Sequence, residues 1–434
     1  MTDPRTAALR RAVALPLVRN TGALVLNTGL NAVLGLGYWV VAARLYAPGT
    51  VGLGAGAISG MMFVASVGWI GLQQVLLRYL PVAGPGSRRL IGTVYAAAMA
   101  IALGAALAFL AYASGQPTLS FLTADGGTTL GFLGAVAVWV VFSLQDPSLI
   151  GLGRAPWVPI ENLAFGAAKL GLLAAFAGLA SPWAIFGSWI LGAAWLVVVV
   201  NALLRRLPAP AATSSPADPP GLGRIARFAI GQHVIAVVVA APDSLAPLLI
   251  LALLGDEATA FYYAAWTISF SVRLLAVNLG SAVTVEGASR GGPRSAASGT
   301  AALPDPHAIR RLVALVIVPA VALAWMLAGA VMSVYGARYA TEATDLLRLL
   351  LLAVVPFTGV TLFVVGERLA ERTGPSLAVA AFVTATTLAL DVVLLPRIGI
   401  AGAGVASLSA QIGGILLAGL ILARRARPDP NQAV

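Results

Sequence analysis

The chain has no cysteine in its 434 residues, and it has only two histidines, His233 and His307. Without cysteine it forms no disulfide, no thiolate metal site and no cysteine nucleophile. Two histidines leave little material for a zinc site or for a catalytic triad. We therefore expect a protein that is not an enzyme, with no catalytic residues, no metal site and no cofactor.

The sequence also has few charged residues. Only 10% of the residues are charged, whereas soluble domains carry roughly 25%, and 59% are hydrophobic. The mean hydropathy is +0.92. A soluble protein this poor in charge lacks the polar residues to cover its surface, so the natural solvent is lipid. The sequence predicts a polytopic helical membrane protein embedded in a lipid bilayer.

Lysine is almost absent: Lys169 is the only one, although the net charge is +11. The basic residues are scattered as short pairs in loops rather than gathered on one face, so we expect no nucleic-acid binding. At the N-terminus, Arg5, Arg10, Arg11 and Arg19 precede the first apolar run, and no small-residue cleavage site ends a short apolar core. This pattern indicates a retained cytoplasmic tail rather than a signal peptide.

Apolar runs long enough to cross a membrane recur along the whole chain. Charged residues and turn residues separate them into twelve candidate helices, so the sequence predicts an all-α membrane protein. The predicted spans are 22–44, 51–79, 90–113, 129–152, 157–179, 182–204, 226–254, 259–285, 309–333, 343–366, 375–395 and 400–422.

The positions of the basic residues test this count. With the N-terminus in the cytoplasm, most of the 27 Lys and Arg residues fall in the tails and in the loops on the cytoplasmic side, and the outward loops hold only Arg44, Arg338 and Arg397. A miscounted helix would invert the alternation further along the chain. The distribution predicts twelve spans with both termini in the cytoplasm. The 26 Arg to one Lys, with abundant Ala and Gly, is typical of a GC-rich bacterial genome, so we expect the bacterial cytoplasmic membrane.

The longest polar loop, at 205–224, is rich in proline, alanine and serine, which is typical of a flexible linker. It divides the chain into a predicted N-terminal lobe, 1–204 with six helices, and a predicted C-terminal lobe, 225–434 with six more. The two halves match at an offset of about 209 residues, which favours a parallel repeat because six helices return the chain to the same side. Chance similarity between hydrophobic helices is the alternative.

Several charged and polar residues fall inside the predicted spans. A charge at mid-bilayer costs at least ~2.5 kcal/mol on insertion scales, so such a residue faces a bundle interior or water. The candidate cavity cations are Lys169, Arg273 and Arg348; the candidate gating or coupling acids are Asp146, Glu161 and Asp243; and the candidate polar lining is Asn27, Asn31, Gln73 and Asn278. For each charge, an ion pair that only joins helices is the structural alternative, strongest for Arg348 because Asp345 and Glu342 are near it in sequence. We interpret Asp391, near Arg397, as structural.

Helical spacing relates Glu161 to Lys169. Eight residues turn a helix by roughly 800°, so the two side chains are offset by about 80° and Lys169 lies about 12 Å deeper. They cannot pair within their own helix, although both can line one cavity. Asp243 is flanked by Pro242 and Pro247, which free backbone groups and predict a broken helix beside a cavity.

Three stretches of the chain are similar to one known family. Residues 27–81, NTGLNAVLGLGYWVVAARLYAPGTVGLGAGAISGMMFVASVGWIGLQQVLLRYLP, resemble the opening helix pair of bacterial polysaccharide-biosynthesis (Wzx-type) flippases. These proteins belong to the multidrug/oligosaccharidyl-lipid/polysaccharide (MOP) superfamily. Residues 145–173, QDPSLIGLGRAPWVPIENLAFGAAKLGLL, look like the fourth and fifth helices of that family. Residues 335–356 and 394–414, YGARYATEATDLLRLLLLAVVP and LLPRIGIAGAGVASLSAQIGG, are similar to its last three helices.

The resemblance implies two lobes of six helices around a central cavity. It also implies alternating access, in which a polyprenyl-diphosphate-linked anionic oligosaccharide moves from the inner to the outer leaflet. Lys169, Arg273 and Arg348 would then contact the diphosphate or acidic sugars. Asp146, Glu161 or Asp243 would gate the cavity through ion pairs or carry a coupling ion, H⁺ or Na⁺. We expect a monomer.

Two other functions stay open. A MATE-type exporter of cationic drugs shares the fold, but it would need acids at the centre of each lobe and few buried cations. A membrane polysaccharide polymerase or ligase would need an acceptor site, usually on a large external loop. The longest outward loop here, at 114–129, is short and has no base–nucleophile pair.

Overall fold

The structure, a computed structural model, describes residues 31–69, 71–206, 222–298, 311, 313–370 and 372–426. These residues form helices and no strand. After a first helix over Asn31–Leu45, the α-helices are α2 (Pro48–Trp69), α3 (Leu72–Tyr79), α4 (Ser87–Ala113), α5 (Gly126–Gly151), α6 (Trp157–Ala175), α7 (Pro182–Arg206), α8 (Leu222–Leu254), α9 (Asp256–Ser298), α11 (Val318–Met326), α12 (Ala328–Tyr335), α13 (Ala337–Leu369), α14 (Thr373–Ile398) and α15 (Ala401–Ala426).

The predicted class, an all-α membrane protein, is confirmed. Within the described residues, ten helices are long and apolar enough to cross a membrane. The pair Val313–Met326 and Ala328–Tyr335, bent by 58°, makes an eleventh if it is one span. The helix Asn31–Leu45 is shorter, and the earlier part of the predicted span 22–44 lies outside the described residues. The count of twelve stays a prediction.

Two spans differ from the sequence prediction in their continuity. The predicted span 51–79 is interrupted, because α2 ends at Trp69 and α3 begins at Leu72. Gly68 lies in the last turn of α2 and Gly71 directly precedes α3, and glycine is a poor helix former. Conversely, the break predicted at Pro242 and Pro247 was wrong, since α8 runs through both prolines without interruption. Neighbouring helices support such prolines in membrane segments.

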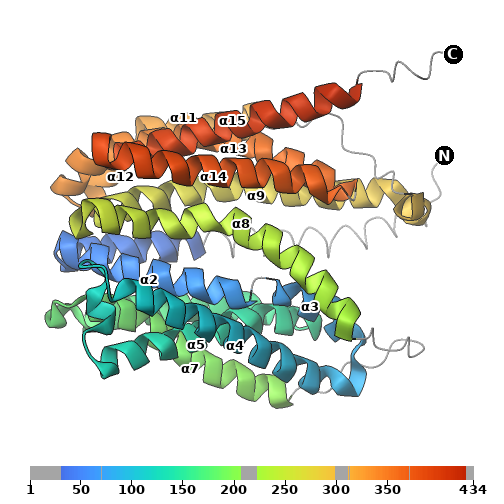
Figure 1. Ribbon diagram of the computed structural model, residues 1–434, viewed down its shortest axis with the longest axis horizontal. Helices are drawn as coiled ribbons and strands as arrows, with labels where there is room; N and C mark the ends of the chain where they lie inside the picture. The colour runs from blue at the N-terminus through green and yellow to red at the C-terminus, as the bar shows by residue number, and fades with distance from the viewer. Residues whose placement is uncertain are drawn as a thin grey trace, which may run out of the picture.

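The helices pack in two groups, seen one above the other in Figure 1. We call the lower group the N lobe; it contains the first helix and α2 to α7. The upper group, the C lobe, contains α8 to α15. Helix α2 packs against α4, α5 and α7 within its own lobe and against α8 and α9 of the other. The predicted linker 205–224 lies mainly outside the described residues, so the boundary between the predicted lobes stays a prediction.

At one end of the bundle, which we call the closed end, the lobes touch closely. Gly255 joins α8 to α9 with φ +89°, a conformation that favours glycine. The chain then begins α9 directly against α2: a Cβ on Gly52 would overlap the main-chain oxygen of Asp256. Nearby, Arg44 donates to the carbonyl oxygens of Val334 (2.8 Å) and Ser333 (3.1 Å). The missing side chain at Gly52 therefore sets how near the two lobes come at this end.

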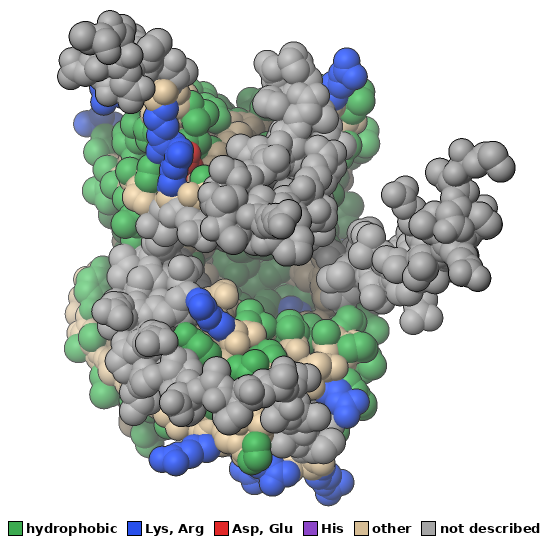
Figure 2. Space-filling model, turned by 90° about the vertical axis from the view of Figure 1, so that its right-hand side faces the viewer, with side chains coloured by type: hydrophobic (Ala, Val, Ile, Leu, Met, Phe, Trp, Pro, Cys, Tyr) green, Lys and Arg blue, Asp and Glu red, His purple; other side chains and the backbone are tan. Residues whose placement is uncertain are grey.

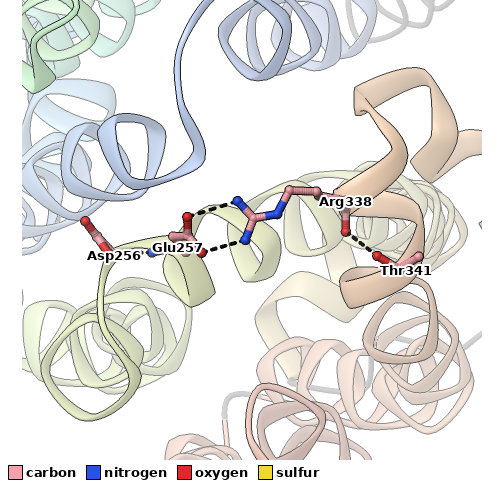
Figure 3. Close-up of polar contacts among 4 residues, drawn as sticks. All are labelled: Asp256, Glu257, Arg338 and Thr341. Atoms are coloured by element: carbon pink, nitrogen blue, oxygen red, sulfur yellow. Dashed lines mark hydrogen bonds and ion pairs between the residues drawn. The ribbon is translucent and has the colours of Figure 1, made fainter.

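A surface ion pair lies beside this contact, within the C lobe. Figure 3 shows Arg338 of α13 paired through two nitrogens with Glu257 of α9, at 3.0 and 2.7 Å. Thr341 donates back to the Arg338 carbonyl at 3.0 Å. Both charged side chains are about half exposed (59% and 49%), so the pair adds little stability.

At the opposite end, the linker end, α7 finishes at Arg206 and α8 begins at Leu222. Figure 2 looks at this end and shows a recess between the two lobes, with hydrophobic side chains in it. Arginine side chains are spread over the surface around it. The molecule is thus closed at one end and hollowed at the other.

Candidate functional site

The C lobe contains a cavity of about 470 Å³. Its walls are α8, α9, α13, α14 and α15. Most of the lining is apolar or aromatic, and a small group of polar side chains interrupts it. The charged and amide members of that group are Asp243, Arg273, Asp391 and Gln411. A largely apolar cavity with a few convergent polar groups is typical of a ligand site.

Arg273 and Asp243 form a two-pronged ion pair in this cavity. Nη1 of Arg273 lies 2.7 Å from Oδ1 of Asp243, and Nη2 lies 3.3 Å from Oδ2. Trp266 Nε1 donates to Oδ1 at 3.3 Å, and the guanidinium carbon lies 4.2 Å from the centre of the Phe357 ring. The pair keeps 22% (Arg273) and 30% (Asp243) of its side-chain area exposed, so a ligand in the cavity can reach both charges.

Asp391 and Gln411 complete the polar group. Asp391 is 1% exposed, and neither of its carboxylate oxygens has a hydrogen-bond partner among the described residues. The Gln411 side-chain oxygen lacks one as well. We interpreted Asp391 as structural from its nearness to Arg397, but it lines the cavity. The helical spacing of Thr384, Thr387 and Asp391 on α14 is a signal that could have found it.

The N lobe buries its own cation, Lys169 of α6, in a different environment. The residue is 6% exposed. Its Nζ atom lies 3.6 Å from the centre of the Trp189 ring, 4.8 Å from that of Phe165 and 5.1 Å from that of Tyr38. We call these three rings the aromatic box. No ion pair joins Lys169 to any residue that the structure describes, so ring faces surround its ammonium group instead of carboxylates.

Local packing holds the box in shape. The Tyr38 hydroxyl donates to the Ile185 carbonyl at 2.9 Å, and it lies 2.9 Å from Ser188 Oγ. These bonds fix the ring that comes from the first helix against α7. Gly192 of α7 lets that helix approach α6, because a Cβ there would lie 3.2 Å from the Lys169 main chain and Cβ. Small and aromatic residues on three helices therefore position the single lysine.

The two predicted acids of the N lobe lie toward the linker end. Asn162 donates to Asp146 Oδ2 at 3.2 Å, which joins α6 to α5. Glu161 is 4% exposed, and neither of its oxygens has a hydrogen-bond partner among the described residues. As the helical spacing requires, Glu161 and Lys169 do not pair. Their roles in gating or coupling stay predictions.

A chain of aromatic rings connects the surroundings of Lys169 with those of Arg273. Trp189, beside Lys169, lies 6.2 Å from Trp39, and Trp39 lies 4.4 Å from Tyr263 of α9 in the C lobe. Tyr263 lies 5.3 Å from Trp266, which is hydrogen-bonded to Asp243. The contact between Trp39 and Tyr263 thus crosses from one lobe to the other, between the two candidate sites.

Solved structures of two kinds of transporter resemble this arrangement. The lipid II flippase MurJ, in an inward closed conformation, matches with a TM-score of 0.69 and 12% identity, over 92% of this chain and 87% of that one. A multidrug resistance MATE family transporter, inward-facing, matches with a TM-score of 0.59 and 14% identity, over 92% and 96%. A MOP-superfamily transporter from Pyrococcus furiosus matches with a TM-score of 0.63 and 13% identity, over 93% and 94%.

The chain has the MOP transporter fold. No protein-family model and no curated protein sequence matches it. The agreement covers nearly the whole of both chains, so it confirms the predicted MOP-type architecture. These three structures are a flippase and two transporters, in line with the prediction that the chain is not an enzyme.

Within the MOP fold, the remaining predicted residues lie apart from the cavity lining. Arg348 of α13 pairs with Asp345 of the same helix at 3.2 Å and lies 5.0 Å from the Trp325 ring. Asn278 is exposed on α9, and Gln73 is half-buried on α3. Asn31 is half-buried at the start of the described chain, and Asn27 lies outside the described residues. Their roles stay predictions.

Proposed function

We propose that the protein is an alternating-access flippase that moves a polyprenyl-diphosphate-linked oligosaccharide from the inner to the outer leaflet. The membrane would be the bacterial cytoplasmic membrane, with the linker end in the cytoplasm, as the basic residues of the loops predict. Access would alternate between the recess at the linker end and an opening at the closed end. Both MOP flippases and MOP drug transporters share the fold, so the cargo has to be inferred from the charges.

The observation that carries this proposal is the environment of Lys169. The residue is buried, and no described carboxylate pairs with it. An uncompensated positive charge at membrane depth lowers the barrier for an anionic diphosphate and raises it for a cation. Because ring faces enclose its ammonium, Lys169 acts in this conformation through its electric field rather than through direct contact.

Arg273 supplies the contact that Lys169 does not make. Its guanidinium is accessible in the C-lobe cavity and already holds one two-oxygen anion, the Asp243 carboxylate. A phosphate presents the same paired oxygens to the same fork of donors. We propose that the diphosphate exchanges with Asp243 on Arg273 during transport, which would make that ion pair the gate of the cavity.

Complementation of a flippase-deletion strain tests the proposal. We expect that Lys169→Ala and Arg273→Ala each abolish export of surface polysaccharide while the protein still inserts into the membrane. The matched control is Arg338→Ala, which removes an exposed arginine at the closed end and should leave export intact. Full restoration of surface polysaccharide by both cavity variants would overturn the assignment of an anionic cargo.

One observation favours a second candidate, a MATE-type antiporter of cationic drugs. The C-lobe cavity holds two acids, and Asp391 has no described partner for either oxygen. Such a site suits a coupling ion, H⁺ or Na⁺, or a cationic substrate. Proteoliposomes loaded with ethidium distinguish the two functions. Efflux driven by a proton or sodium gradient, and lost in Asp391→Asn, would support the antiporter. Absence of efflux would count against the antiporter and favour the flippase.

A further inference from the structure

The aromatic box around Lys169 has the composition of an organic-cation site. Three ring faces converge on one ammonium group, at 3.6, 4.8 and 5.1 Å from their centres. Proteins recognise alkylammonium ligands in this way, through the negative faces of aromatic rings and without a carboxylate. Here the cation is covalently part of the chain.

The surroundings of the box show that it is built rather than accidental. The Tyr38 ring is fixed by bonds from its hydroxyl to Ile185 and Ser188. Trp189 is 7% exposed and Phe165 is 7% exposed, so water does not compete for their faces. Tyr38 also meets Trp189 edge-on, with ring centres 5.2 Å apart. A desolvated, rigid box of this kind holds a cation more strongly than an exposed ring does.

The position of the box gives it a consequence for cargo. Trp39 contacts both Trp189 of the box and Tyr263 of the C lobe, so the box borders the contact between the lobes. Because Tyr38, Trp39 and Trp189 are buried in this structure, a cation would reach these rings only when the lobes move apart. The ammonium of Lys169 already occupies them, and its charge repels a second cation.

We propose that the N lobe contains a binding site for an organic cation of alkylammonium size, which the chain fills with its own Lys169 and thereby denies to external cations. Lys169 is then a specificity-determining residue. The inference concerns what the N lobe excludes, and it stands whether the transported cargo is a lipid-linked oligosaccharide or another anion.

Removal of the tethered cation tests this directly. Lys169→Ala leaves the rings in place and deletes a chain equivalent in length to n-propylammonium. We expect the purified variant in detergent to bind n-propylammonium at least tenfold more tightly than the unaltered protein, with a matching rise in melting temperature, because the desolvated ring faces then have no other cation to hold. Isothermal titration calorimetry measures the binding.

Three controls separate the box from a simple hole. The ligand 1-propanol has nearly the same shape and no charge, so it should not bind. Lys169→Met fills the space with an uncharged chain of similar length and should not bind n-propylammonium. Lys169→Ala combined with Trp189→Leu removes the nearest ring and should lose most of the gained affinity. Equal binding of the alcohol and the ammonium, or no gain in Lys169→Ala, would overturn the proposal.

The proposal can be tested even if Lys169→Ala does not fold in the absence of a ligand. If Lys169→Ala is recovered unfolded, we expect purification in n-propylammonium to restore folded protein and purification in 1-propanol not to do so. Recovery with neither compound, or with both equally, would overturn the proposal. None of these readings depends on export, so they fail or succeed separately from the complementation test above.

Discussion

Lys169 in the N lobe is buried and Arg273 in the C lobe is half-buried, and the two lobes surround these cations differently. Arg273 forms a bidentate ion pair with Asp243 inside a cavity and keeps 22% of its side chain exposed. Lys169 is closed in by rings, with no described acid beside it. A guanidinium suits paired oxygens, whereas an ammonium is a compact charge that ring faces can hold. The C lobe therefore offers a place for exchange, and the N lobe offers a fixed charge.

The contact that holds the lobes together gives the largest expected effect. Gly52→Val places side-chain atoms against the Asp256 main chain, so we expect a loss of about 3 kcal/mol, the upper part of the range for overpacking. Thermal unfolding in detergent measures the loss. Spin labels on Leu45→Cys and Thr341→Cys should also report a wider gap between the lobes, with no background because the chain has no cysteine.

Gly104→Val is the matched control for that change. Gly104 lies on α4, is exposed, and has nothing within 4 Å of the position of a Cβ. We expect it to unfold close to the temperature of the unaltered protein. If Gly52→Val unfolds at that temperature as well, the closed end is not the tight contact between the lobes described above.

The C-lobe side of the comparison predicts an intermediate effect. Asp243→Ala leaves Arg273 without its partner, and we expect a loss of roughly 1–2 kcal/mol, less than for a fully buried pair because both side chains are partly exposed. The melting temperature in detergent measures it. Adding Arg273→Met to the same chain should recover part of the loss. A single variant as stable as the unaltered protein would mean that the ion pair contributes nothing to folding.

The N-lobe side predicts the smallest effect. Lys169→Met gives up the cation–π contacts but also removes the cost of burying a charge. The two terms oppose each other, so we expect the stability to change by no more than about 1 kcal/mol in either direction. The same melting experiment measures it. A loss as large as that of Asp243→Ala would show that Lys169 has an interaction that the rings do not account for.

Most of the fold could be predicted from the sequence. Apolar runs of membrane length and the alternation of arginines in the loops depend only on local composition, which is why the all-α membrane class could be read directly. Whether an individual helix is continuous was harder to predict. Prolines at 242 and 247 did not interrupt α8, whereas the region around Gly68 and Gly71 did interrupt the span after α2, because packing by neighbouring helices decides such cases.

Only part of the candidate site could be predicted from the sequence. Burial of Lys169, Arg273 and Asp243 follows from their position in apolar runs, and the separation of Glu161 from Lys169 follows from helical spacing. The aromatic box was not predicted, because Tyr38 comes from a helix far from Lys169 in sequence and Trp189 comes from the following helix. Only Phe165, four residues before Lys169 on α6, could have been placed beside it from helical spacing. Asp391 lines the C-lobe cavity, which its nearness to Arg397 in the sequence does not indicate, and its role stays a prediction.

The glycine contact at the closed end has a mechanical consequence. Helix α2 has 22 residues and runs from this contact toward the linker end, a length of about 33 Å. With the fulcrum at Gly52 and Asp256, the arm from Gly52 to Trp69 is about 26 Å long, so a rotation of about 10° of one lobe would carry its far end by roughly 4–5 Å. The interlobe ring pair, Trp39 and Tyr263, lies partway along that arm and would separate by less. A pivot at the closed end thus makes the lobe a lever, in which a small rotation opens the linker end by several times the displacement near the pivot.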